Sequence, residues 1–210
     1  MLTAVHVDTL DHPVVAAQLT EMRDAATDRP RFRALLHHIT RALVFEAART
    51  TATAPAEVES PMGPAPGVRL VDQPVLVPIL RAGLGMLDAA LEALPASQTG
   101  FLGLKRDEST LQPLAYMDTI PDLKRRPTYI LDPMLATGGS ANYAAGRARA
   151  FGAGEVTLVV LLAAPEGIQA VKDAGLVDRV VTASIDSHLD TSGFIVPGLG
   201  DAGDRQYGVD

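Results

Sequence analysis

Short, continuously apolar segments alternate with helical segments along the last two-thirds of this chain, and this alternation constrains the fold more than any other feature. Strands are expected at residues 75–80, 99–104, 128–131, 156–162 and 179–185, and helices at 85–94, 140–151 and 166–174. Apolar strands that are joined through helices form parallel sheets covered on both faces. The sequence therefore predicts an α/β fold with a parallel sheet core flanked by helices.

The first third of the chain is predicted to be mainly helical. Residues 14–50 carry apolar side chains at helical spacing, and Asp28-Arg29-Pro30 divides them into two helices. Residues 51–67 are rich in Ala, Pro and Thr, so we interpret them as a loop or an edge segment rather than a domain linker. The 210 residues are therefore predicted to form a single domain over 1–210.

The composition excludes several classes of function. A formal net charge of −7 argues against a general nucleic-acid or anionic-membrane binder, so neither partner is expected. The absence of cysteine excludes disulfides, thiolate zinc sites and cysteine nucleophiles, and the histidines lack metal-ligand spacing. The N-terminus does not have the pattern of a signal peptide, and no apolar run has the length of a membrane span. A cytoplasmic location is expected.

The run 129–140 predicts a phosphate-binding loop. It consists of an apolar strand that ends on Asp132, a turn rich in hydroxyl groups and glycine, and the start of an Ala-rich helix. The backbone N–H groups of residues 137–140 are expected to point into one concavity at a helix N-terminus, where the helix dipole favours an anion. Gly138 and Gly139 allow left-handed turns, and Asp132 can bind ribose hydroxyls or a hydrated metal ion. The predicted ligand is a phosphorylated sugar.

The residues alone leave other interpretations open. A strand, a turn and a helix with two glycines occur in many α/β proteins as a plain connection, with Ser140 as an ordinary N-cap. The Walker pattern does not fit, because no lysine follows Gly138 or Gly139. The turn at 81–88 mimics a dinucleotide-binding fingerprint, but Asp88 stands where the third glycine belongs.

Charged residues at the ends of neighbouring strands favour the phosphate hypothesis. Ligands of parallel sheets bind beyond the carboxyl ends of the strands, and Arg81 and Asp132 both follow such ends. Arg106 follows directly from a third apolar strand. The polar stretch 105–116 is predicted to be a hairpin beside the site, and apart from Arg106 its charges are interpreted as solvated.

Three long motifs, in order along the chain, resemble the uracil phosphoribosyltransferases within the type I phosphoribosyltransferases. They are residues 77–86, 131–140 and 195–205, and weaker similarity occurs at His12-Pro13, 19–23, Phe32-Arg33 and 45–47. The resemblance covers nearly the whole chain. It implies the type I phosphoribosyltransferase fold, with an N-terminal helical segment, a flexible β-hairpin flap from Arg106 to about Tyr116 and a C-terminal base-binding hood.

The resemblance implies a pyrimidine-salvage reaction in which uracil and 5-phospho-α-D-ribose 1-diphosphate (PRPP) give UMP and diphosphate, with Mg²⁺ as cofactor. It implies that PRPP is bound by Arg81, Arg106, Asp132, Pro133, Met134, Leu135, Ala136, Thr137, Gly138, Gly139, Ser140 and Asp201. A guanidinium group binds phosphate oxygens bidentately and keeps its charge, which suits the two arginines as diphosphate ligands. The expected catalytic residues are Asp132, Arg106 and Asp201, and Asp201 is the expected contact to PRPP-bound Mg²⁺.

By the same resemblance, the C-terminal motif forms the uracil pocket, with Ile195, Gly200, Asp201 and Ala202 at the base. Its glycines and Pro197 predict a stiff, irregular loop whose main-chain groups face the edge of the base. Fixed donors and acceptors distinguish a carbonyl from an amino group, because a mispaired buried polar atom is costly.

Three positions depart from the patterns of related proteins. Pro133 follows the single carboxylate of Asp132, where many type I relatives have two adjacent acidic residues; this matches the uracil branch. Phe194 stands where tyrosine is common in the family, and residues 190–192 lack the usual asparagine. The last two changes are expected to alter the tuning of uracil affinity rather than the reaction.

Regulation, assembly and base specificity are expected only by resemblance. Some family members are activated by GTP and form tetramers, so a GTP effector and a homodimer or homotetramer are candidate properties. A phosphoribosyltransferase for another base, such as xanthine or orotate, and a regulator that keeps the fold but binds RNA remain as alternatives. Orotate needs a cationic partner for its carboxylate, and RNA binding needs a basic face, which the acidic composition disfavours. No general base for the uracil nitrogen is apparent.

Overall fold

The computed structural model describes residues 5–106 and 113–208, and its centre is an eight-stranded sheet. Seven strands follow the order β1-β10-β9-β7-β4-β5-β6, and β8 pairs with β9 beyond the end of β7. Every pairing is parallel except that of β5 with β6. The strands are β1 (His6–Thr9), β4 (Val75–Leu80), β5 (Leu102–Arg106), β6 (Pro113–Asp118), β7 (Thr128–Leu131), β8 (Met134–Leu135), β9 (Val156–Ala163) and β10 (Arg179–Ile185). The predicted parallel sheet is confirmed.

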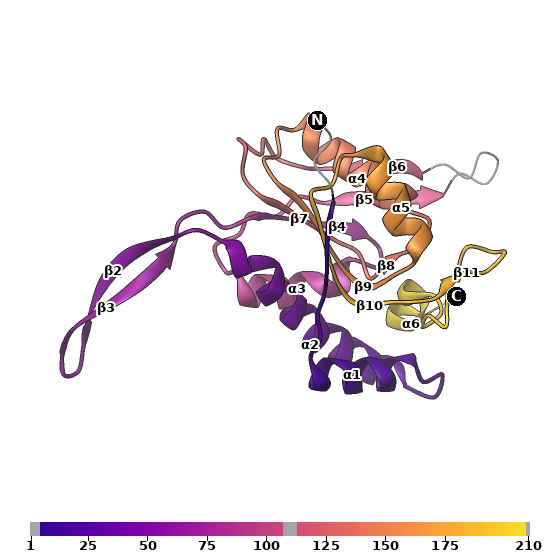
Figure 1. Cartoon of the computed structure of the whole chain (residues 1–210), viewed down its shortest axis with the longest axis horizontal. Coiled ribbons are helices and arrows are strands. Elements are labelled where there is room, and N and C mark those ends of the chain that lie inside the picture. The colour runs from indigo at the N-terminus through magenta and orange to yellow at the C-terminus, as the bar shows by residue number, and fades with distance from the viewer. Residues whose placement is uncertain (1–4, 107–112, 209–210) are drawn as a thin grey trace.

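The central strands are apolar on both faces because helices cover both faces. Every residue of β7 and β9 is buried, and so are the first five residues of β4. Helices α1 (Pro13–Arg23), α2 (Arg29–Ala47) and α3 (Leu84–Ala93) pack on the face that carries Leu76, Leu131 and Val159. Helices α4 (Gly139–Ala150) and α5 (Pro165–Ala174) pack on the face of Val77, Ile130 and Leu158 (Figure 1).

The predicted break between the first two helices is confirmed. Helix α1 ends at Arg23 and α2 begins at Arg29, with Asp28 as its N-cap and Pro30 in its first turn. The Asp28 Oδ1 accepts a hydrogen bond from the Arg31 N–H at 2.8 Å. Such a cap satisfies one of the unpaired donors at a helix start. Among the described residues, no helix combines the length and apolar character needed to cross a membrane.

The interpretation of residues 51–67 as a loop or an edge segment was wrong. They belong to a two-stranded antiparallel arm, β2 (Thr53–Ser60) and β3 (Gly63–Leu70), which leaves the body of the molecule after the 3₁₀ turn Ala48–Thr50 (Figure 1). Its prolines suggested a loop. A two-stranded ribbon tolerates proline because each strand has an unpaired edge, and here Pro64 and Pro66 lie opposite Glu59 and Glu57.

The C-terminal segment is more regular than the irregular loop predicted. It contains a small pairing of β11 (His188–Leu189) with β12 (Ile195–Val196), followed by helix α6 (Ala202–Tyr207). Helix α6 packs against α2, so the last segment of the chain returns to the N-terminal helices. The structure thus confirms both the N-terminal helical segment and a C-terminal cover near the carboxyl edge of the sheet (Figure 1).

Candidate active site

The carboxyl ends of β4 and β7 lie side by side, as the sequence predicts. The two strands pair in parallel with Pro78 opposite Leu131, so Arg81 and Asp132 follow neighbouring ends. A Cβ atom at Gly83 would lie 2.2 Å from the Leu131 carbonyl oxygen, so only glycine allows the loop after β4 to approach the end of β7 this closely. The Leu80–Arg81 peptide bond at this point is cis.

The run after β7 forms a cradle at the N-terminus of α4. Gly138 is the N-cap, with a left-handed φ of 82°, and the helix begins at Gly139, so Ser140 is not the N-cap. No side chain of the described residues caps this end. The cradle holds a cavity of about 140 Å³ lined by Asp132, Met134, Leu135, Ala136, Thr137, Gly138, Gly139, Ser140 and Ala141. Uncapped N–H groups at a helix start form a site for an anion.

Asp132 lies deep in the fold and is only partly accessible to solvent. Burial raises the pKa of its carboxyl group from 3.8 to about 7, while a hydrogen bond from the Met134 backbone acts in the opposite direction. Desolvation disfavours the charged form of a carboxyl group. The fold therefore disfavours the ionised form of Asp132 relative to an exposed carboxyl group.

A second cavity, of about 200 Å³, lies under the C-terminal segment. Its lining is Ala82, Asp132, Met134, Ala136, Gly193, Phe194, Ile195, Gly200, Asp201, Ala202 and Gly203. The four residues predicted to contact the base therefore lie together. Asp132, Met134 and Ala136 line both cavities. The cradle at the start of α4 and the predicted base pocket therefore adjoin each other.

Asp201 lies at the rim of this site and begins α6. Its Oδ1 accepts a hydrogen bond from the Asp204 N–H at 2.8 Å, so the side chain is also the N-cap of that helix. The described residues contain no group of three or more His, Asp or Glu that could hold a metal ion by themselves. The carboxylates that the site offers to a cation are those of Asp132 and Asp201.

Two of the predicted PRPP ligands, Arg81 and Pro133, are not among the described residues that line the two cavities. Arg81 is 68% exposed and lies 3.8 Å from Asp204 Oδ1, outside the lining of both cavities. Arg106 ends β5, and its side chain lies outside the described part of the structure, as does the flap tip at 107–112. The antiparallel pairing of β5 with β6 confirms a hairpin at this position. Pro133 is buried, and its carbonyl accepts hydrogen bonds from the N–H groups of Leu161 and Leu162.

Gln206, which no sequence pattern indicated, joins the two sides of the site. This residue is fully buried on α6, and its Nε2 donates to the Ala82 carbonyl at 3.0 Å and to the Ala202 carbonyl at 2.8 Å. Ala82 follows β4 and Ala202 lines the base pocket. The sequence around Gln206 carries no local signal of such a role, because the contact with Ala82, 124 residues away, is set by tertiary packing.

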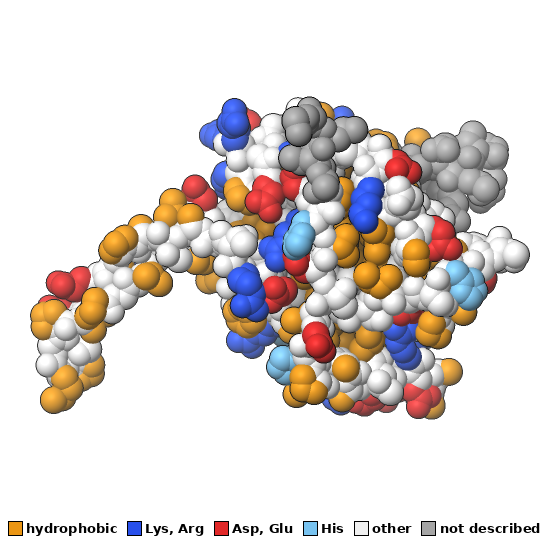
Figure 2. Space-filling view, viewed as in Figure 1, with side chains coloured by type: hydrophobic (Ala, Val, Ile, Leu, Met, Phe, Trp, Pro, Cys, Tyr) orange, Lys and Arg blue, Asp and Glu red, His pale blue; other side chains and the backbone are white. Residues whose placement is uncertain are grey.

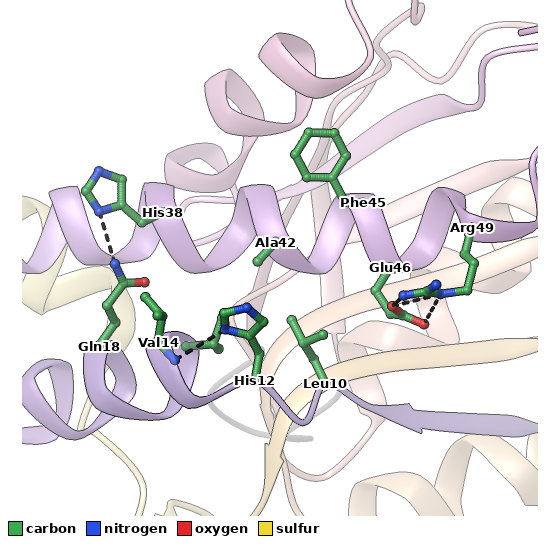
Figure 3. Close-up of a pocket in the computed structure, with 10 residues that line it drawn as sticks. Leu10, His12, Val14, Gln18, His38, Ala42, Phe45, Glu46 and Arg49 are labelled. Atoms are coloured by element: carbon green, nitrogen blue, oxygen red, sulfur yellow. Dashed lines mark hydrogen bonds and ion pairs between the residues drawn. The ribbon is translucent and has the colours of Figure 1, made fainter. Parts of the chain in front are cut away.

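A larger cavity, of about 560 Å³, lies between the start of α1 and the outer face of α2 (Figure 3). His12, Phe45 and Arg49 are among the side chains around it, with Glu46 paired to Arg49. None of the predicted site residues lines it. The carboxyl edge of the sheet therefore remains the candidate active site.

Sequence and structure comparisons show the family of the chain. A profile of the family described as "Uracil phosphoribosyltransferase" matches residues 9–209. The chain belongs to the uracil phosphoribosyltransferase family. Proteins named uracil phosphoribosyltransferase from Kineococcus radiotolerans and Streptomyces avermitilis are 49% and 50% identical to it, over 98% of this chain and 100% and 99% of theirs. A solved structure described as the AQ2163 protein from Aquifex aeolicus is 36% identical, with a TM-score of 0.91 over 97% of this chain and 99% of that one.

Family membership confirms the resemblance that the three motifs indicated. The activity is that of a pentosyltransferase of pyrimidine salvage, which transfers a phosphoribosyl group to uracil. The predicted α/β fold with a mostly parallel, helix-covered sheet is also confirmed.

Proposed function

We propose that the joined cavity is where this enzyme binds PRPP and uracil, with the 5-phosphate in the cradle at residues 137–140 and the base under the C-terminal segment. The observation that carries this proposal is the shared lining of the two cavities by Asp132, Met134 and Ala136. A phosphate at one end and a base at the other place the ribose over Asp132. The transfer takes place at the anomeric carbon between them.

Departure of diphosphate from PRPP leaves an oxocarbenium-like ribose, so stabilisation of the leaving group supplies much of the catalysis. Arg81 and Arg106 are proposed as its ligands, because a guanidinium binds phosphate oxygens bidentately and stays charged. Arg81 follows β4 and Arg106 is the last residue of β5, so both lie at the carboxyl edge of the sheet. The 3.8 Å separation between Arg81 and Asp204 is a weak, exposed contact that a diphosphate can replace.

Uracil is proposed to be recognised by main-chain groups of Ile195, Gly200 and Ala202. The first and last of these are buried, and Gly200 has a left-handed φ of 78°. Backbone groups that are fixed in this way favour a base with matching carbonyl and N–H positions. Phe194, half-exposed at the mouth of the pocket, brings a ring without a hydroxyl group.

Mg²⁺ is the proposed cofactor, and the residues present fit an ion that arrives with PRPP. Mg²⁺ is commonly bound through one or two carboxylates together with substrate phosphates, and Asp132 and Asp201 line one cavity. When bound, the ion neutralises charge on the diphosphate. Asp201 is the proposed contact, and its engagement as the N-cap of α6 orients the carboxylate.

A homodimer or homotetramer is proposed, with the β2–β3 arm as an element of the contact. The arm contributes none of the residues of the two hydrophobic cores, and it exposes Val58, Val68 and Met62, the last of which is 96% exposed. Figure 2 shows hydrophobic side chains along its length. Exposed apolar surface of this kind marks an association site. A GTP effector and a cytoplasmic location stay predictions from the sequence.

The proposed specificity is tested by measuring UMP formation from PRPP and uracil with Mg²⁺, beside parallel reactions with xanthine, hypoxanthine and orotate. We expect turnover with uracil and none of comparable rate with the other bases, and we expect a chelator to abolish it. Turnover with another base at the rate of uracil would overturn the assignment of the base pocket. Unchanged turnover in the presence of the chelator would overturn the role of Mg²⁺.

A further inference from the structure

Both backbone polar groups of Gly198, in the base loop (residues 195–202), are held by an ion pair between Arg23 and Asp186, which does not line the pocket. The Gly198 N–H donates to Asp186 Oδ2 at 2.9 Å, and the Gly198 carbonyl accepts from Arg23 Nη1 at 2.7 Å. Gly198 has a φ of 59°, and a Cβ atom there would lie 2.0 Å from the Ile195 carbonyl oxygen. The backbone therefore turns tightly at this point, and the pair fixes the plane of the turn.

The geometry of the pair is bidentate. Arg23 Nη1 and Nη2 lie 2.7 and 2.6 Å from the two carboxylate oxygens of Asp186, which is only 7% exposed. The Ser184 hydroxyl donates to Asp186 Oδ1 at 3.1 Å. Burial by itself would raise the pKa of Asp186, but the hydrogen bonds from Arg23, Gly198 and Ser184 lower it below its usual value. The carboxylate is thus ionised and saturated with donors.

A buried ion pair contributes little net stability, because desolvation offsets its attraction, whereas its fork geometry fixes orientation. Arg23 ends α1 and Asp186 follows β10, so the pair ties the base loop to two elements of the rigid body. Arg205 of α6 adds a second link between the loop and α1, because its Nη1 donates to the carbonyls of Leu199 in the loop and Met22 in α1. The base loop is anchored to the end of α1 at both points.

We propose that the Arg23–Asp186 pair positions the uracil pocket: by holding the two peptide groups that flank the Gly198 Cα, it sets the directions of the main-chain groups between Ile195 and Ala202 that meet the base. The inference rests on the proposed assignment of this loop to uracil. Arg23 and Asp186 thus affect the affinity for uracil without contacting either substrate.

The test compares two Arg–carboxylate pairs at opposite ends of the sheet. Asp186→Asn keeps the shape of the side chain but removes the charge and one acceptor beside the base loop. Asp178→Asn is the matched control, because Asp178 Oδ2 pairs with Arg149 at 2.6 Å and accepts the Val156 N–H at 2.7 Å, before β10 and away from the pocket. A purely structural role predicts similar behaviour of the two variants.

We expect Asp186→Asn to raise the KM for uracil at saturating PRPP about tenfold or more, which corresponds to the loss of one well-placed hydrogen bond. The KM for PRPP should change less than about twofold, a change too small to represent a lost contact. Asp178→Asn should leave both KM values unchanged. Arg23→Lys keeps the positive charge but loses the bidentate geometry of the guanidinium group, so it should give the same selective rise in the KM for uracil. This variant replaces Asp186→Asn in the test if Asp186→Asn does not fold.

Equal changes in both KM values, or a uracil KM unchanged in Asp186→Asn and Arg23→Lys, would overturn the inference. Ala202→Leu separates this failure from that of the base pocket. If Ala202→Leu raises the uracil KM while the ion-pair variants do not, the pocket assignment stands and the positioning role falls. If none of these variants affects the uracil KM, both assignments fall.

Discussion

At the scale of single residues, Asp132 combines burial with a place at the centre of the site. A carboxyl group in this position is kept from full ionisation by desolvation, and its pKa is raised to about 7. In the free enzyme, ionisation of Asp132 therefore costs free energy. In the proposed complex, the ribose hydroxyls or Mg²⁺ would supply the partners that the charged form lacks, so ligand binding is expected to favour loss of the proton.

This cost predicts a pH-dependent difference in stability between the wild type and Asp132→Asn. The unfolded chain ionises Asp132 near 3.8 and the folded chain near 7, so the folded state holds the extra proton between these values. The free energy of unfolding of the wild type should therefore fall by at most about 4 kcal/mol, relative to that of the variant, as the pH rises from about 4 to 7. Above pH 7 the difference should stay constant. Urea unfolding of both proteins at pH 5 and pH 8 measures this difference. The same change in the free energy of unfolding with pH in both proteins would contradict the raised pKa.

The residues of the site were predictable to the extent that they follow strand ends or stand in long motifs. Asp132 met both conditions and Ile195 and Ala202 met the second, and all three line the cavity under the C-terminal segment. Gln206, Arg23 and Asp186 escaped prediction because their partners lie far away in sequence; Arg23 and Asp186 are 163 residues apart. The raised pKa of Asp132 could not be predicted either, since it depends on burial by segments from several parts of the chain.

At the scale of elements, the turn into α4 depends on one left-handed glycine. A Cβ atom at Gly138 would lie 2.8 Å from the Ala170 Cβ, at a backbone φ of 82°. Gly138→Ala should therefore lower the free energy of unfolding by about 1–2 kcal/mol or more. It should also raise the KM for PRPP, because the N–H groups of the cradle shift with the turn.

Gly146→Ala is the control for that prediction, since it makes the same change within the same helix. Its Cβ would make an ordinary contact, 3.7 Å from Leu176 Cδ1, at a helical φ. It should raise the free energy of unfolding by about 0.5–1 kcal/mol and leave the KM for PRPP unchanged. Chemical denaturation and steady-state kinetics on both variants measure the contrast. Equal effects at the two positions would show that the cradle does not depend on the left-handed turn.

Strands of the largely buried centre of the sheet were predicted with the most accurate bounds. The bounds expected for residues 75–80, 128–131 and 179–185 are those of β4, β7 and β10. The arm was missed because its residues face solvent on both sides, so neither apolar alternation nor a continuous apolar run marks it. The strand expected from residue 99 begins at Leu102, and Thr99 forms only an isolated bridge to Leu76.

At the scale of the whole molecule, the arm is separable from the fold and is proposed to serve association. Replacing residues 54–69 by a Gly-Ser turn should leave the circular dichroism spectrum of the helices unchanged, because the arm adds nothing to either core. It should lower the molar mass measured by light scattering to that of a smaller assembly. Glu57→Gln, a change of charge on the exposed arm, should leave the mass unchanged. A truncated protein with the mass of the full chain would contradict the proposal.

The molecule as a whole brings a phosphate cradle and a base loop to one edge of the sheet. The motif order indicated both, but only the sheet order, with β7 between β4 and β9, makes them neighbours. The proposed function depends above all on the two parts of the site meeting at Asp132.

A crystal structure of the enzyme with UMP tests this claim most directly. The account predicts the 5′-phosphate on the N–H groups of residues 137–140, the ribose hydroxyls near Asp132, and the uracil between Ile195 and Ala202. A nucleotide bound with its base away from this loop, for example in the cavity between α1 and α2 (Figure 3), would contradict it.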